Sequence, residues 1–138
     1  MRLQLEPVSE SVGVARRTVR QYGDAAGMEA QRLDDVCLAV SEAVTNAITV
    51  HQAAAHDEPV AMEVSATDEG VLCVDVIDCG PGFEPLSPEE CEAAVRDRTG
   101  DLEGGLGVTL MRALADDIAF DHDDGTTVRM CFALQGGC

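Results

Sequence analysis

Residues Ala39 to Ile48 read AVSEAVTNAI, and this stretch has the pattern of an amphipathic helix. On a helical wheel at about 100° per residue, its apolar residues gather on one side and most of its polar residues on the other. Glu42 and Asn46 are one helical turn apart at the margin of the polar arc, so they point the same way and could be half-buried in a cleft. Taken alone, the stretch also fits a solvated helix face.

The composition indicates one folded domain and excludes several functions. A chain of 138 residues with 46% hydrophobic and 25% charged residues is long enough and apolar enough to bury a core. The formal net charge of -17 argues against nucleic-acid binding, which needs clustered cations. All nine basic residues are arginines. The absence of lysine excludes Schiff-base chemistry and a P-loop.

The cysteines indicate neither a zinc site nor a disulfide framework. Six are scattered along the chain without a CxxC pair, and several lie in apolar patterns, where a cysteine is usually a small buried hydrophobe. No apolar signal region or membrane-length run is present in the sequence. We therefore expect a reduced, soluble, cytoplasmic domain that neither enters a membrane nor contacts nucleic acid directly.

The hydrophobic periodicity predicts an α+β fold in which helices cover one face of a mixed, mostly antiparallel sheet. We expect a single domain over residues 1–138, with an edge strand near the N-terminus and a central strand over 71–78. The expected strands are 2–6, 60–67, 71–78, 118–122 and 126–134. The expected helices run from a cap at Ser9 or Ser11 to Gly23, from 29 to 51, briefly from a capping box at 87–90, and from 106 to 115.

A second group of polar and glycine residues follows the central strand. Asp78 ends that strand, and Gly80 and Gly82 come directly after it in the sequence DCGPG. Glycines allow the backbone to approach a flat ligand closely, and the carboxylate could accept a hydrogen bond from an exocyclic amine such as that of adenine. A turn that leaves the sheet also explains this pattern.

A third group opens the last long helix. Gly105, Leu106 and Gly107 lie in the sequence GGLGVTL, where glycines at a helix N-terminus expose amide donors to an anion. Phosphate contacts of this kind need no lysine. A hinge before an ordinary core helix is the simpler alternative for this motif by itself.

The order of these three groups resembles the GHKL ATPase superfamily, which has the Bergerat fold, and within it the small anti-sigma-factor serine kinases. The resemblance covers essentially the whole chain and implies that ATP and Mg²⁺ are the cofactors. It implies that Glu42 is the general base and Asn46 the magnesium ligand. It also implies that Asp78 binds the adenine amine, with Gly80 and Gly82 in the same ATP-binding box.

The resemblance assigns the later motifs as well. Gly105, Leu106 and Gly107 correspond to the phosphate box, and the segment at about 83–104 corresponds to the ATP lid. Thr126, in the family's Gly-Thr pair, is expected to support the adenine site through its hydroxyl group.

Three further residues have roles that the resemblance implies for the lid and for partner binding. Arg98 and Thr99 are expected to contact phosphate from the lid, and Arg16 is expected to lie near the surface used for partner contact. The resemblance implies a homodimeric anti-sigma factor that sequesters a sigma factor and phosphorylates an anti-anti-sigma partner of the STAS type.

A nucleotide-binding, partner-switching regulator without kinase activity is the alternative. The catalytic module of a sensor histidine kinase would need a phosphoacceptor hairpin for which the chain has no room, and a plain interaction domain would need no ATP.

Overall fold

The computed structural model describes residues 1–55, 57–78, 103–121 and 125–134, and for residues 103–107 it describes the helical backbone alone. The strands are β1 (Arg2–Leu5), β2 (Val60–Ala66), β3 (Val71–Asp78), β4 (Asp117–Asp121) and β5 (Thr126–Ala133). The helices are α1 (Glu10–Ala25), α2 (Ala30–Ala53) and α4 (Glu103–Leu114).

The five strands form one sheet in the order β1-β2-β3-β5-β4. Every neighbouring pair among these described strands is antiparallel, so the expected mostly antiparallel sheet is confirmed, without a parallel pair in this part of the chain. β3 is the central strand, as its near-continuous apolar sequence predicted. β1 lies at the edge and ends at Leu5, two residues before Pro7, which cannot donate a ladder hydrogen bond.

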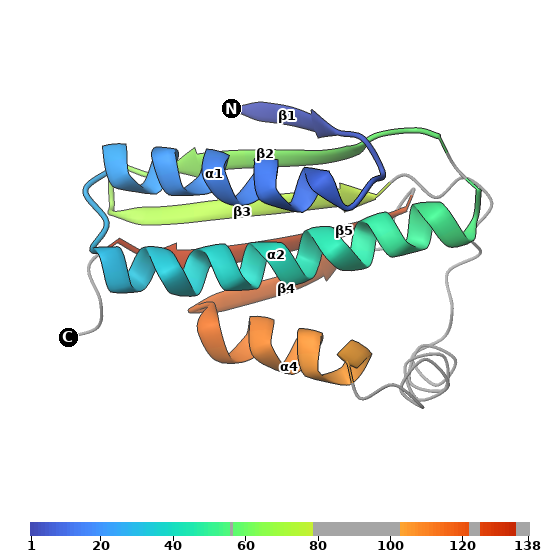
Figure 1. Ribbon diagram of the computed structural model, residues 1–138. Coiled ribbons are helices and arrows are strands. Elements are labelled where there is room, and N and C mark those ends of the chain that lie inside the picture. The colour runs from blue at the N-terminus through green and yellow to red at the C-terminus, as the bar shows by residue number, and fades with distance from the viewer. Residues whose placement is uncertain (56, 79–102, 122–124, 135–138) are drawn as a thin grey trace.

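Helices α1, α2 and α4 lie on one face of the sheet, so the fold has two layers (Figure 1). Alternate residues of β3 point toward the helices, because successive side chains of a strand face opposite ways. Of these, Leu72, Val74 and Val76 are buried. They join the apolar side of α2 in one core, which also contains Val36, Ala39, Val40, Ala43, Val44, Ala47 and Ile48.

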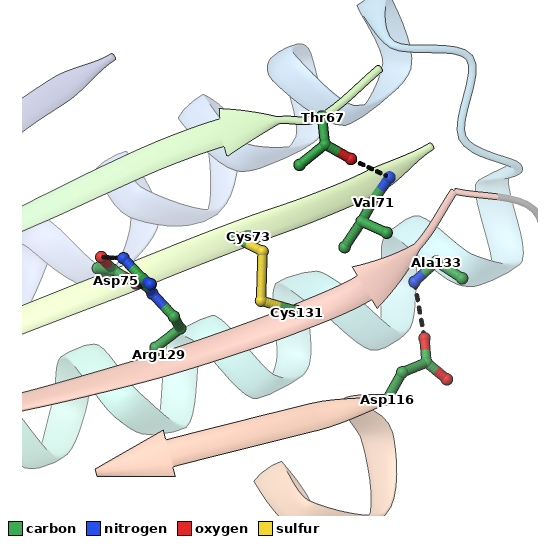
Figure 2. Close-up of a disulfide and its surroundings, with 8 residues drawn as sticks. All are labelled: Thr67, Val71, Cys73, Asp75, Asp116, Arg129, Cys131 and Ala133. Carbon is green, nitrogen blue, oxygen red and sulfur yellow. Dashed lines mark hydrogen bonds and ion pairs between the residues drawn. A yellow bond between two sulfur atoms is a disulfide. The ribbon is translucent and has the colours of Figure 1, made fainter. Parts of the chain in front are cut away.

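The other face of the sheet carries a disulfide and an ion pair (Figure 2). Cys73 and Cys131 are directly opposed in the β3–β5 register and form a disulfide. In the next opposed pair on that face, Arg129 Nε and Nη2 donate to the two carboxylate oxygens of Asp75, both at 2.8 Å. The expectation of buried, reduced cysteines is therefore wrong for Cys73 and Cys131. It holds for Cys37, which is free and buried, and burial raises the pKa of its thiol.

The ends of α1 differ from the expectation. Ser9 occupies the N-cap position, but its side chain makes no capping hydrogen bond. Gly23 does not end the helix: α1 continues to Ala25, and Gly27 adopts the positive φ of 89° that follows the helix. A Cβ added at Gly23 would lie 2.3 Å from Cδ2 of Leu33 in α2. The absence of a side chain at Gly23 therefore leaves room for Leu33 where α1 packs against α2.

The short helix expected at 87–90 lies outside the described residues. Of the helices that the structure describes, none has the length and apolarity needed to cross a membrane.

Candidate functional site

Glu42 and Asn46 lie one helical turn apart in the second half of α2. Arg32 lies ten residues before Glu42 and fourteen before Asn46, so all three side chains project from the same side of the helix. Nη1 of Arg32 donates to the carbonyl oxygen of Leu114, the last residue of α4, at 3.0 Å. Glu42 and Asn46 are half-buried, as their place at the margin of the polar arc predicted.

The glycine-rich motif opens α4, and α4 runs antiparallel to α2 (Figure 1). The helix begins at Glu103, three residues earlier than expected. Gly105 therefore lies within the first turn, whose amides have no partner inside the helix, and Gly107 lies in the second turn. Because Leu114 is anchored near the start of α2, the opening of α4 is directed toward the later part of α2, which carries Asn46.

Asp78 is the last residue of β3, on the face of the sheet that the helices cover. It is only 8% exposed, which is unusual for a carboxylate. Its Oδ1 accepts a hydrogen bond from the backbone amide of Thr126 at 3.3 Å, and the two residues are opposed in the β3–β5 register. Gly125, directly before β5, has a positive φ of 103°, a backbone conformation that glycine adopts without steric cost.

These elements meet at one end of the molecule. The carboxyl end of β3, the start of β5, the start of α4 and the later part of α2 all lie toward the right in Figure 1. The arrangement places a buried carboxylate, a helix N-terminus and a half-buried carboxylate–amide pair at the same end of the fold. Gly80, Gly82, Arg98 and Thr99 lie outside the described residues, so their predicted roles stay predictions.

A groove of about 660 Å³ runs between α1 and α2 on the side away from the sheet. It is lined by Gly13, Arg16, Arg17, Arg20, Asp34, Cys37, Leu38, Ser41 and Glu42. Arg16 is exposed there, and Arg20 forms an ion pair with Asp34 at 2.7 Å. Three of the nine arginines of a chain with net charge -17 therefore line a single groove, which ends at Glu42.

The donor set fits magnesium held with a nucleotide rather than a metal held by protein alone. Within the described ranges, no group of three or more His, Cys, Asp or Glu side chains could hold a metal ion. Mg²⁺ bound with ATP takes most of its ligands from phosphates and water and needs only one or two from the protein. The half-buried side chain of Asn46 carries an amide oxygen, which is a ligand type that suits this role.

Two residues to which the sequence assigned no role make buried or partly buried contacts in the structure. Arg32 joins α2 to the end of α4, which no local pattern indicates because its partner is 82 residues away. His51 is fully buried, and its Nδ1 lies 2.8 Å from the carbonyl oxygen of Glu58. It packs on the core side of α2, away from the side that carries Asn46.

Comparisons with known proteins agree with this fold. The sequence pattern of the histidine kinase-like ATPase domain matches residues 5–132. The serine-protein kinase RsbW of Listeria monocytogenes is 31% identical over 132 residues, covering 93% of this chain and 83% of that protein. RsbW of Bacillus velezensis is 34% identical over 142 residues, covering 99% and 85%. The structure of the RsbU and RsbW domains of a Mycobacterium tuberculosis protein superposes with a TM-score of 0.71 at 19% identity, covering 97% of this chain and 31% of that one.

Proposed function

This chain belongs to the histidine kinase-like ATPase family, and from that membership we propose that it is an ATP-dependent serine/threonine protein kinase and anti-sigma factor. The relatives named serine-protein kinase RsbW support the reaction. One observation carries the proposal: Asp78, paired with the Thr126 amide, ends β3 at the same end of the fold as the start of α4 and the later part of α2.

Asp78 recognises the adenine ring. Its carboxylate already accepts the Thr126 amide and accepts a second hydrogen bond from the exocyclic amine of adenine. Because the group is 8% exposed, water competes weakly for that bond. The Thr126 hydroxyl supports the same site, with Gly80 and Gly82 providing close approach for the purine.

The triphosphate lies between α2 and the opening of α4. The backbone amides of the first turn of α4, which contains Gly105 and Leu106 and is followed by Gly107, donate to phosphate oxygens, and the helix dipole favours the negative charge. The amide oxygen of Asn46 holds the Mg²⁺ that accompanies ATP. When bound, that ion neutralises phosphate charge and helps to align the transferred group.

Glu42 takes the proton from the hydroxyl group of the incoming serine or threonine. Its position supports this role, because it lies one turn before Asn46 and at the end of the α1–α2 groove, through which a partner side chain can approach. Phosphoryl transfer otherwise needs positioning and charge neutralisation, to which Arg98 and Thr99 of the proposed lid at about 83–104 contribute by contacting phosphate.

The partners are a sigma factor and an anti-anti-sigma protein of the STAS type. Exposed Arg16 and its neighbours in the α1–α2 groove contact an acidic partner surface, because they form a local cationic groove on an acidic protein. Phosphorylation adds negative charge at the anti-anti-sigma interface and releases that partner, leaving the kinase free to hold the sigma factor. The protein acts as a homodimer in the cytoplasm.

Transfer of labelled phosphate tests this function. The protein is incubated with Mg²⁺ and ATP labelled at the γ position, together with anti-anti-sigma proteins encoded beside it. Label on a serine or threonine of such a partner is expected. ATP binding without transfer would favour the alternative of a partner-switching regulator that uses ATP only to order its lid. The absence of ATP binding would contradict both.

A further inference from the structure

Arg32 lies in the first turn of α2, and its guanidinium group contacts the end of α4 and three nearby side chains. Nη1 donates to the Leu114 carbonyl oxygen at 3.0 Å and lies 3.5 Å from Asp35 Oδ2. Nη2 forms an ion pair with the carboxylate of Asp116. The guanidinium carbon lies 5.5 Å from the centre of the Phe132 ring, which is within range of a cation–π contact.

Asp116 is itself fixed to the sheet. Its Oδ2 accepts the Ala133 amide at 2.7 Å, as Figure 2 shows, and its own amide donates to the Cys131 carbonyl oxygen at 2.9 Å. Arg32 therefore connects the start of α2, the end of α4 and strand β5. The Arg32 side chain is 16% exposed; both of its Nη atoms are paired, whereas its Nε is buried without a hydrogen-bond partner among the described residues.

Because α2 and α4 are antiparallel, the contact at Arg32 also affects the position of the opposite end of α4, where the glycine motif lies. Glu42 lies ten residues beyond Arg32, about 15 Å along α2, and Gly107 lies seven residues before Leu114, about 10 Å along α4. Both helices therefore run from the same anchor toward the proposed triphosphate site. A rotation or slip of α4 about its anchored end would move the glycine amides relative to Glu42 and Asn46.

We propose that Arg32 is a positioning residue for the ATP site, which it never touches: it holds α4 so that the glycine amides stay opposite Asn46. This inference rests on the proposed function. When Arg32 is lost, a smaller fraction of molecules has α4 in the binding-competent position. The apparent dissociation constant for ATP rises in inverse proportion to that fraction.

Substitution of Arg32 by methionine and by lysine tests the inference. Arg32→Met keeps much of the apolar stem and removes the hydrogen bonds and the charge. We expect its KM for ATP to rise about tenfold, with kcat at saturating ATP within about twofold of wild type, because bound ATP restores the position of α4. Arg32→Lys should recover part of the affinity, since an ammonium group can contact the carbonyl oxygen or the carboxylate but lacks the planar fork.

Arg2→Met is the matched control. Arg2 forms an exposed ion pair with Glu63 at the β1 edge of the sheet, so its replacement makes the same change of charge away from α4. Its KM should stay at the wild-type value. A purely structural role of Arg32 would lower the melting temperature and the active fraction, and hence kcat, without raising KM.

The outcomes separate the two claims. Wild-type KM in Arg32→Met, measured below its melting temperature, would overturn the inference and leave the proposed function standing. A wild-type protein that binds no ATP would overturn both. If Arg32→Met does not fold, Asp116→Asn replaces it. That variant keeps an oxygen for the Ala133 amide but loses the charge facing Arg32, so a smaller rise in KM is expected. An unchanged KM in it would overturn the inference.

Discussion

Replacement of Asp78 by asparagine changes one atom in the proposed adenine site and gives a result that can be calculated. The carboxylate has two acceptor oxygens, and Oδ1 accepts the Thr126 amide at 3.3 Å. Asparagine has one acceptor oxygen. If that oxygen keeps the Thr126 bond, the side chain presents an NH2 group to the adenine amine, so that two donors face each other.

The magnitude follows from the burial of Asp78. At 8% exposure, little water is available to replace the lost bond. A hydrogen bond to a charged group contributes about 1.5–3 kcal/mol, and each 1.36 kcal/mol is a factor of ten in affinity, so ATP binding should weaken about 10- to 150-fold. The free energy of unfolding should change by less than about 1 kcal/mol, because the asparagine still accepts the hydrogen bond from the Thr126 amide. GTP, which carries a carbonyl oxygen where ATP carries the amine, should lose less affinity than ATP.

Isothermal titration calorimetry measures these changes, with wild type and Asp78→Asn each titrated with ATP and with GTP in the presence of Mg²⁺. Thermal unfolding of both proteins is the control. Unchanged ATP affinity in the folded variant would refute the adenine assignment. An equal loss for ATP and GTP together with a lower melting temperature would show that Asp78 acts through the fold.

Two further predictions concern stability. The Cys73–Cys131 disulfide closes a loop with a sequence separation of 58, so its removal should lower the free energy of unfolding by about 4 kcal/mol on the loop-entropy scale. Urea unfolding with and without reductant tests this, and identical curves would show that the bond contributes nothing. Gly23→Ala should destabilise the protein by about 1–3 kcal/mol, because the added methyl group would lie 2.3 Å from Leu33 Cδ2. Gly13→Ala in the same helix meets Arg17 Nη1 only at 3.4 Å and should stabilise by about 0.5–1 kcal/mol, so equal effects of the two changes would contradict the close approach of α1 and α2.

The periodic parts of the fold could be predicted because burial imposes a period on the sequence. Strand β3 has the bounds that its apolar run indicated, and its central place follows from that run. The half-burial of Glu42 and Asn46 could be predicted for the same reason, since a helical wheel places them at the edge of the apolar side. These are local properties of one element.

The features that depend on pairing between distant residues could not be predicted. The disulfide requires the β3–β5 register, which brings together two cysteines 58 positions apart, and the spacing of the cysteines in the sequence does not indicate this pairing. The contact of Arg32 with Leu114 spans 82 residues. Gly23 and Gly27 are equally good helix ends by local rules, but Gly23 lies inside α1 against Leu33 of α2, and it is Gly27 that has the positive φ. At the site, the sequence supplied the residue types, and the antiparallel packing of α2 and α4 supplied their arrangement.

The most direct measurement of the central claim compares ATP affinity with the single-turnover rate of phosphate transfer in Glu42→Ala. A general base contributes about two to four powers of ten to the rate, so transfer to the anti-anti-sigma partner should fall by that factor while the dissociation constant for ATP stays within about threefold of wild type. Transfer at the wild-type rate in this variant would contradict the account, because the half-buried carboxylate on α2 would then have no part in the chemistry.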